Sequence, residues 1–295
     1  MYSFVPVTYN IPFGYLGDEL RRSFFNELAL NGAKHVVLGA GLLPLLMSRP
    51  ELPEMVASEM EETGLSFVDS HAPYGGHWDL AAPYEAEHSL KVLRLKLAIE
   101  LAAFFKVRTM TLHLGKKGFC VSDGEYLDPI YKSLDELLPF AEEKKVILCI
   151  ENGFAYRGFP QKILEIKERY PEDTLGFCFD AGHANMTTAP ESFQGTVGRR
   201  TTSEEILEVM LPHIVNCHIH DNDGVNDKHD LPGRGCADWE KIVAKLRTAP
   251  RLQVIQSEVN IASRGVAVRE LVETFDKLFG KRGNFKSIRF LSNNQ

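Results

Sequence analysis

The stretch IVNCHIHDND, residues 214–223, joins a short apolar run to a cluster of histidine and aspartate side chains. The run has the length of one β-strand, and a strand that is apolar throughout is typical of a parallel sheet buried on both faces. Residues alternate faces along a strand, so His218 and His220 are expected to point the same way. This stretch therefore predicts a buried parallel strand that ends in polar, chemically active side chains.

The same pattern recurs along the whole chain. Short apolar runs alternate with longer segments whose apolar residues have helical spacing, and eight such pairs predict a (β/α)₈ TIM barrel of the α/β class with parallel strands. The expected strands are residues 4–9, 35–41, 65–70, 107–114, 145–151, 175–180, 214–220 and 252–258. The expected helices are residues 20–30, 52–62, 84–105, 127–143, 160–168, 203–211, 239–247 and 266–279.

Length and composition fit this fold. The chain has 295 residues, and an α/β barrel uses about 250 residues as one domain. We expect a single barrel over residues 1–280, followed by a polar C-terminal tail over residues 281–295. A hydrophobic content of 44% is enough for a sizeable core. The net charge of −7 gives no electrostatic footprint for nucleic acid, so a nucleic-acid partner is not expected.

Cysteine usage and the N-terminal segment indicate a compartment. The five cysteines are odd in number and form no CxxC motif, which favours reduced thiols. The first residues, MYSFVPVTYNIPFG, lack the basic and apolar regions of a signal peptide. No run approaches the roughly 18 apolar residues of a membrane span. We expect a cytoplasmic protein without a membrane partner, assembled as a homo-oligomer.

Chemistry-bearing residues follow six consecutive strands of the expected barrel. In a barrel these strand ends converge on one face, where active sites of this fold lie. Imidazole and carboxylate groups together are the ligand set of zinc, manganese, iron or magnesium, whereas the absence of cysteine at these ends argues against a structural zinc site. The segments are Asp69–Tyr74, His113–Gly115, Glu151–Gly153, Asp180–Asn185, His218–Asp223 and Glu258–Asn260.

Two features of the seventh strand and its loop leave alternatives open. Of His218 and His220, one is expected to be a ligand and the other a substrate contact or a support for a ligand. In the loop that follows, Asp227 and His229 form a pair that could hold a further ion. Arg234 either clamps a phosphate or carboxylate through its guanidinium fork or is an ordinary surface arginine.

Several phrases resemble a known superfamily. They are CIENG at residues 149–153, CFDAGHAN at 178–185, HIHDNDG at 218–224 and the Asp238-Trp239 pair. As a set they resemble the xylose-isomerase-like barrels, and within them the sugar phosphate isomerase/epimerase branch. Endonuclease IV belongs to the same superfamily. The resemblance extends from the first expected strand to the last expected helix.

The resemblance implies a shared metal site at Glu151, Asp180, His218 and Glu258. In the epimerases the two glutamates also lie on opposite sides of a substrate carbon and exchange its proton, and the position of His183 contacts a substrate oxygen. That branch often carries an arginine six residues after the strand-seven histidine. This chain has Gly224 there, which puts ketose binding of that particular kind in doubt.

Endonuclease IV holds three zinc ions with the same four positions and five more. This chain has a matching residue at each of the five, namely His71, His113, His183, Asp227 and His229. An abasic-site DNA hydrolase is therefore an alternative, against which the acidic charge balance stands. Certain lyases that act on sugar-derived substrates also resemble this barrel and are a second alternative.

Our leading hypothesis is a metal-dependent isomerase or epimerase of a small sugar, sugar phosphate or polyol, acting by proton transfer through an enediolate. The cofactor is a divalent metal such as Mn²⁺, Zn²⁺, Mg²⁺, Fe²⁺ or Co²⁺. Glu151 and Glu258 are the expected proton-transfer residues. The residues expected to bind substrate are His71, His113, His183, His229 and Arg234.

Overall fold

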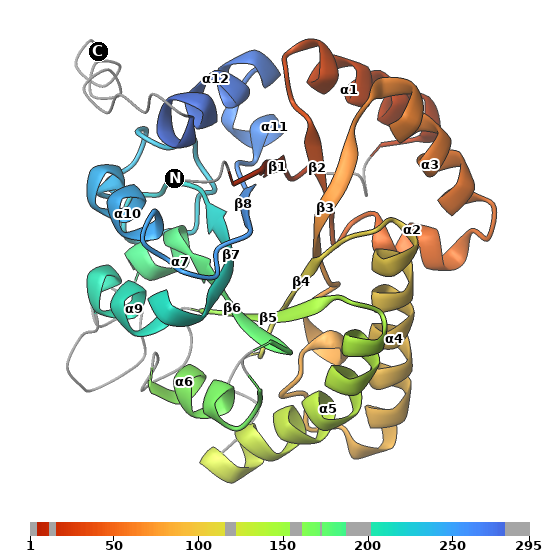
Figure 1. Cartoon of the computed structure of the whole chain (residues 1–295), viewed down its shortest axis with the longest axis vertical. Coiled ribbons are helices and arrows are strands. Elements are labelled where there is room, and N and C mark those ends of the chain that lie inside the picture. Colours follow the sequence, from red (N-terminus) through yellow and green to blue (C-terminus); the bar gives the residue numbers. More distant parts are fainter. Residues whose placement is uncertain are drawn as a thin grey trace.

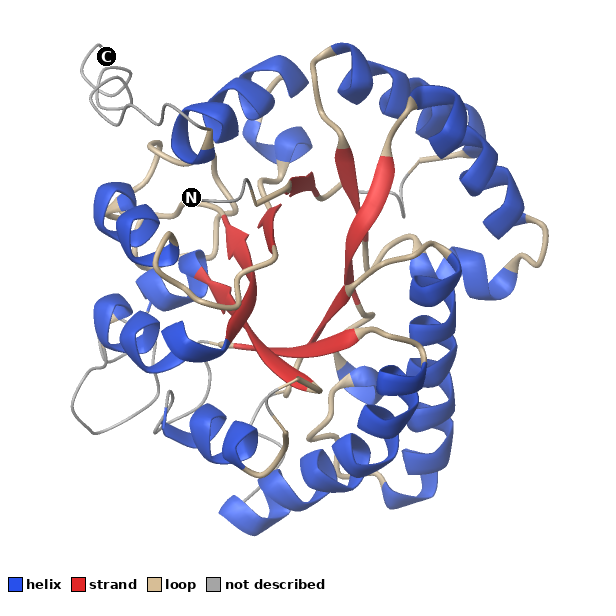
Figure 2. Cartoon of the chain, in the orientation of Figure 1, coloured by secondary structure: helices blue, strands red, loops and turns tan. Residues whose placement is uncertain are grey.

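The computed structural model describes residues 5–11, 16–115, 122–153, 161–171, 173–186 and 202–280, and these form a closed barrel of eight parallel strands. Each strand pairs with the next along the chain, and β8 pairs with β1 to close the ring. Figure 1 follows this order around the barrel, and Figure 2 shows the strands as a central ring enclosed by helices. The strands are β1 (Val7–Tyr9), β2 (His35–Leu38), β3 (Ser66–His71), β4 (Thr109–Leu112), β5 (Ile147–Glu151), β6 (Leu175–Asp180), β7 (Ile214–Ile219) and β8 (Val254–Ser257).

Helices follow every strand and form the outer layer. Two of them begin with a capping box, in which Ser122 and Thr202 each accept a hydrogen bond from a backbone N–H three residues on. The helices are α1 (Asp18–Leu30), α2 (Leu43–Ser48), α3 (Leu52–Thr63), α4 (His88–Phe104), α5 (Asp123–Glu143), α6 (Gln161–Glu168), α7 (Ala181–Met186), α9 (Ser203–Met210), α10 (Trp239–Leu246), α11 (Ile261–Arg264) and α12 (Val268–Phe279).

The core lies between the ring of strands and the helices. Every residue of β6 and of β7 is buried, as expected for strands covered on both faces. The helices contribute one apolar stripe each. In α12 the buried residues Val268, Leu271, Val272, Phe275 and Leu278 recur every three or four positions, so they share the face that packs on the barrel.

Polar side chains, rather than aliphatic ones, occupy part of the barrel interior. Asn216 on β7 donates to Asp69 on β3 at 2.9 Å and to Thr111 on β4 at 3.0 Å. Because β7 neighbours neither β3 nor β4 in the sheet, these bonds cross the inside of the barrel. Barrel interiors are usually filled by Val, Ile and Leu, so a layer of polar side chains at this position is unusual.

The structure confirms the predicted barrel and all eight strand–helix pairs. Strand ends differ by up to a few residues, and three short helices that the periodicity did not indicate, α2, α7 and α11, follow β2, β6 and β8. Helices of four to six residues are too short to develop a helical repeat of apolar residues. The predicted tail, residues 281–295, lies outside the described residues.

Of the cysteines, Cys149, Cys178 and Cys217 are buried free thiols, as predicted, and Cys236 is exposed, while Cys120 lies outside the described residues. Among the helices of the described ranges, none combines the length and the apolar character needed to cross a membrane.

Candidate metal centre

Four acidic and imidazole groups meet at the carboxyl ends of β5 to β8. Glu151 ends β5, Asp180 ends β6, His218 lies near the end of β7, and Glu258 directly follows β8. Asp180 and His218 are register partners, so they lie at the same height in the sheet. All four side chains are at most 8% exposed. The barrel topology thus gathers residues spread over more than 100 positions into one buried cluster.

The distances around His218 match those of a metal site. Its Nδ1 atom lies 3.3 Å from Glu258 Oε1, 3.6 Å from Asp180 Oδ2 and 3.6 Å from Glu151 Oε1. Four ligand atoms bound tetrahedrally at about 2.1 Å from one ion lie about 3.4 Å apart. The spacing therefore suits a divalent cation between His218, Asp180 and Glu258, whose ligand atoms all lie within 4.8 Å of one another, with Glu151 beside them.

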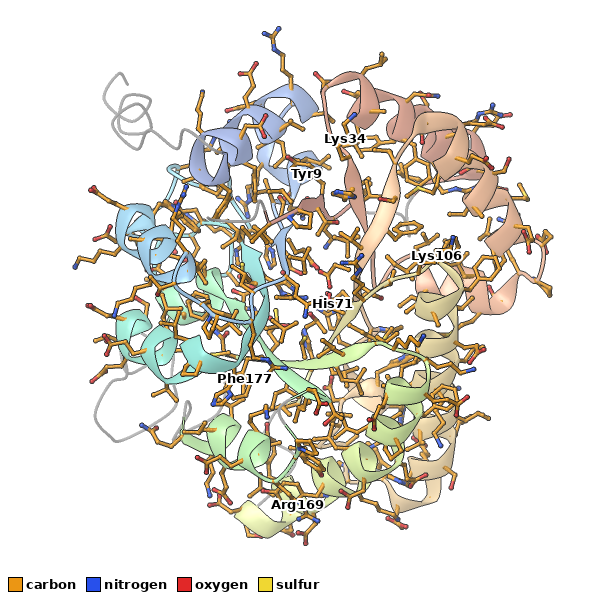
Figure 3. The ribbon with its side chains drawn as sticks, viewed as in Figure 1. Tyr9, Lys34, His71, Lys106, Arg169 and Phe177 are labelled. Atoms are coloured by element: carbon orange, nitrogen blue, oxygen red, sulfur yellow. The ribbon has the colours of Figure 1, made fainter. Side chains whose placement is uncertain are left out.

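A second group shares Glu151. The Nε2 atom of His113 lies 2.9 Å from Glu151 Oε2, and that of His71 lies 3.6 Å from the same oxygen. His71 ends β3 and His113 directly follows β4, so both come from the neighbouring strand ends. Figure 3 places His71 near the centre of the ring of strands. The exposed ring of Tyr74 stacks on His113, with ring centroids 4.4 Å apart.

A third group is formed by α7 and the loop after β7. Asp227 Oδ2 lies 3.5 Å from His183 Nε2 and 3.1 Å from His229 Nε2. His183 also lies 3.0 Å from Glu151 Oε1 through its Nδ1 atom, which joins this group to the first. The structure thus brings together nine of the ten predicted site residues in three adjoining clusters.

Backbone carbonyls orient three of these histidines. A carbonyl oxygen only accepts hydrogen bonds, so the imidazole nitrogen that faces it must carry the proton. The other nitrogen, Nε2, faces a carboxylate in each case, and it can bind a cation when it carries no proton. Nδ1 of His71 donates to the carbonyl of Ala72 at 2.8 Å. Nδ1 of His183 donates to the carbonyl of Asn152 at 3.0 Å, and Nδ1 of His229 donates to the carbonyl of Glu258 at 2.8 Å.

Electrostatics couples the members of the cluster. Burial by itself raises the pKa of a carboxyl group, yet His113 and His218 hold the pKa of Glu151 well below its ordinary value. Burial likewise opposes ionisation of Asp180, but His183 and His220 keep its pKa low. Burial lowers the pKa of His229, whereas Asp227 and Glu258 raise it, with a net value of about 9.

Two buried imidazole nitrogens of the cluster have no hydrogen-bond partner among the described residues. They are His218 Nδ1 and His220 Nδ1. An unpartnered buried polar atom costs about 1–3 kcal/mol, so these two nitrogens indicate a missing partner. A divalent cation would satisfy carboxylate oxygen and imidazole nitrogen together. The residues present therefore fit a divalent metal.

His220 is a site residue whose role the sequence left undecided. Its Nε2 atom donates to both oxygens of Asp180, at 3.1 and 3.2 Å, and its ring stacks on His229 with centroids 3.9 Å apart. It thus supports a candidate ligand, which is one of the two roles expected for the second histidine of the strand. The predicted barrel already made β6 and β7 neighbours, but the direction of the His220 ring toward Asp180 became visible only in the structure.

Arg234 is the one predicted residue that the structure does not bring into the cluster. Its guanidinium donates to Glu270 Oε1 at 2.7 Å and to the carbonyl of Arg264 at 3.1 Å. These contacts hold it beside α11 and α12, where it pairs with protein groups. Its role in substrate binding stays a prediction from the sequence.

Fold and site together define a class of protein: a (β/α)₈ barrel with histidines and carboxylates clustered at the carboxyl ends of its strands. A family model described as the xylose isomerase-like TIM barrel matches residues 27–272. The chain belongs to this family.

Individual proteins are similar to this chain over most of its length. The uncharacterized protein MJ1311 of Methanocaldococcus jannaschii is 27% identical over 220 residues, which are 72% of this chain and 71% of that protein. A D-tagatose 3-epimerase-like protein shares the fold with a TM-score of 0.72 at 20% identity, over 92% of this chain and 96% of the other. The TTHB071 protein of Thermus thermophilus, in a structure soaked with ZnCl₂, has a TM-score of 0.60 at 22% identity over 91% and 97%.

Proposed function

We propose that this protein is a metal-dependent isomerase or epimerase of a small sugar, sugar phosphate or polyol. The observation that carries the proposal is the placement of two glutamates around one imidazole nitrogen: Glu151 lies 3.6 Å and Glu258 3.3 Å from His218 Nδ1. A reaction that moves a proton on a substrate carbon needs a base and an acid at one centre. Similarity to the D-tagatose 3-epimerase-like protein supports a sugar-like substrate.

The two glutamates have different surroundings. Glu151 lies within 3.6 Å of four imidazole rings, those of His71, His113, His183 and His218. Such a carboxylate is a weak base, because the neighbouring positive charge favours its ionised form. Glu258 accepts a hydrogen bond from Gln256 at 2.7 Å and has fewer imidazole neighbours. We therefore assign proton removal from the substrate to Glu258, and we assign metal binding chiefly to Glu151.

The ligands of the proposed ion are Glu151, Asp180, His218 and Glu258. A divalent cation bound there supplies Lewis-acid stabilisation of the negative charge that develops on substrate oxygens. The protein's own part is to hold these four buried side chains in place and to present a carboxylate to the reacting carbon.

Substrate contacts are assigned by exposure. The side chains of His113 and His229 are 26% and 30% exposed, so they can reach a molecule at the mouth of the barrel. Those of His71 and His183 are only 5% and 10% exposed, which suits ligands of further ions better than contacts to substrate. His113 and His229 would donate or accept hydrogen bonds with substrate hydroxyls.

The test is solvent deuterium exchange. The reconstituted enzyme is incubated in D₂O with a panel of ketoses, ketose phosphates and polyol-derived ketones, and deuterium on carbon is followed by NMR. The wild type should incorporate deuterium at one carbon, whereas Glu258→Gln should lose incorporation by at least about 100-fold, the lower range for removal of a general base. Glu273→Gln, an exposed glutamate on α12, is the control.

The metal content of Glu258→Gln must be measured in the same preparation, because a variant without metal would not test the base. Incorporation at the wild-type rate in the metal-loaded variant would contradict the assignment of Glu258. Fragments of the substrate in place of isomers would favour a lyase.

A second candidate function, hydrolysis of a phosphodiester at an abasic site, is favoured by the additional clusters. His71 and His113 around Glu151 and His183 and His229 around Asp227 offer ligands for two further ions, and several metals together can activate water and stabilise an in-line displacement. A nicking assay on DNA with one abasic site decides. Cleavage together with three zinc ions per chain would replace the isomerase proposal.

A further inference from the structure

His218 is held differently from the other histidines of the site. His71, His183 and His229 each face a backbone carbonyl through Nδ1, whereas His218 faces the hydroxyl of Thr111 through Nε2, at 3.3 Å. Its Nδ1 atom is thereby turned toward the three carboxylates. Both His218 and Thr111 are fully buried, so no solvent takes the place of this contact.

Thr111 is in turn fixed by the polar layer inside the barrel. The Asn216 amide donates to Thr111 Oγ1 at 3.0 Å and to Asp69 Oδ1 at 2.9 Å, and Thr109 Oγ1 donates to the same Asp69 oxygen at 2.6 Å. Each of these side chains is at most 1% exposed. These hydrogen bonds therefore connect Thr109 and Asp69 to Asn216, Asn216 to Thr111, and Thr111 to His218, across the inside of the barrel.

A purely structural reason does not account for this layer. Burying polar groups costs free energy that hydrogen bonds only offset, and aliphatic side chains would fill the same space without that cost. Thr8 makes the comparison within the barrel: it is a fully buried threonine on β1 whose hydroxyl has no hydrogen-bond partner in the part of the chain that the structure describes. A threonine that merely fills space and one that contacts His218 thus occur in the same ring of strands.

We propose that Thr111, anchored by Asn216 and Asp69, is a positioning residue that accepts the Nε2–H of His218 and so directs the Nδ1 lone pair of His218 into the cation site. The inference rests on the metal site of the proposed function. A hydroxyl suits this position because its oxygen keeps a second lone pair for His218 after accepting from Asn216. Histidine ligands commonly donate their other N–H to a neighbouring group, which fixes the ring and the protonated nitrogen.

The test replaces Thr111 by valine, which keeps the shape and removes the hydroxyl, and by serine, which restores it. Zn²⁺ and Mn²⁺ affinities of the full-length protein are measured by competition with a chelating dye. Thr111→Val should weaken binding by about 10- to 100-fold, the usual effect of removing such a partner of a ligand. Thr111→Ser should stay within about threefold of the wild type, and so should Thr8→Val.

A second readout does not depend on affinity. In ¹⁵N-histidine-labelled, zinc-loaded protein, the His218 ring should carry its proton on Nε2 and show slow exchange of that proton with solvent. His218→Gln identifies the signal. Thr111→Val should accelerate the exchange, and Thr8→Val should not.

The outcomes separate this inference from the function. A wild type that binds metal and a Thr111→Val variant that binds it equally well would overturn the positioning role while leaving the proposed function intact. A zinc-loaded His218 with its proton on Nδ1 would overturn it as well. A wild type that binds no divalent metal would overturn both, because nothing would then require an oriented lone pair.

Discussion

His220 Nε2 lies 3.1 Å from Asp180 Oδ1 and 3.2 Å from Asp180 Oδ2, so one buried imidazole N–H is shared between both oxygens of a candidate ligand. Asp180 Oδ1 also accepts the backbone N–H of His183 at 2.6 Å, and Asp180 Oδ2 lies 3.6 Å from His218 Nδ1. The orientation of the Asp180 carboxylate is therefore determined before any ion binds.

Replacing His220 by alanine should loosen Asp180 and weaken divalent-metal binding by about 10- to 100-fold. His220→Gln, whose amide can still donate to Asp180, should lose less. Isothermal titration with Zn²⁺ measures both variants. Unchanged affinity in His220→Ala would show that Asp180 needs no such support.

Gly182 packs against the ring of His220 and offers a second test of how that ring is placed. A Cβ atom at this position would lie 2.0 Å from His220 Cε1, and both residues are fully enclosed. Gly182→Ala should therefore destabilise the protein by about 1–3 kcal/mol through overpacking. The double variant Gly182→Ala/His220→Ala should recover most of that loss, because the ring that collides is gone. Urea unfolding of the four proteins gives the coupling, and simple additivity would contradict the predicted clash.

Asp221 is predicted to hold the loop after β7 in place without entering the metal site. It is fully buried and accepts hydrogen bonds from Trp239 Nε1 at 2.7 Å, Gly233 N at 2.8 Å and Asn222 N at 2.9 Å. Asp221→Asn replaces an accepting oxygen by an amide that donates, so it should cost about 1–3 kcal/mol of stability.

The fluorescence of Trp239 reports the change in this loop during urea unfolding. Asp223→Asn, a more exposed aspartate of the same loop, is the matched control and should cost less than about 1 kcal/mol. Equal losses of stability in the two variants would mean that the buried hydrogen bonds of Asp221 contribute no more to stability than the exposed ones of Asp223.

The barrel and the position of its site could be predicted from the sequence, because buried parallel strands appear as apolar runs and each run is followed by polar residues. The convergence of Glu151, Asp180, His218 and Glu258 follows from barrel closure, and the structure brings them together as predicted. The supporting contacts could not be predicted. Thr111 and Asn216 lie within strands that read only as mostly apolar, and their partners sit across the barrel.

Arg234 illustrates the opposite limit. Its position in a turn-rich loop left two predictions open, an anion clamp and an ordinary surface arginine, and its guanidinium donates to Glu270, 36 residues further along the chain. A competing partner on a distant helix leaves no trace in the local sequence. The short helix α7 was not predicted either. It begins directly after Asp180, so no loop residues mark a boundary between the strand and the helix.

Lys91 provides a prediction on pH. Burial lowers its pKa to about 8, and its ammonium group donates a hydrogen bond to the carbonyl of Leu80 at 3.0 Å. The unfolded chain keeps the ordinary, higher lysine pKa, so between about pH 8 and 10 the unfolded state binds more protons than the folded one. The wild type should therefore gain stability relative to Lys91→Met as the pH rises through this window. Urea midpoints of both proteins at pH 7, 8, 9 and 10 measure the difference, and a flat difference would contradict the lowered pKa of Lys91.

The central claim is that the histidine–carboxylate cluster binds divalent metal, and the most direct test is the metal content of the purified protein. The protein is stripped with a chelator, reconstituted with Zn²⁺ or Mn²⁺, freed of excess metal and analysed by mass spectrometry of the elements. We predict at least one tightly held ion per chain in the wild type and its loss in Asp180→Ala. A wild type that retains no divalent ion, or an Asp180→Ala variant that retains as many as the wild type, would contradict the account.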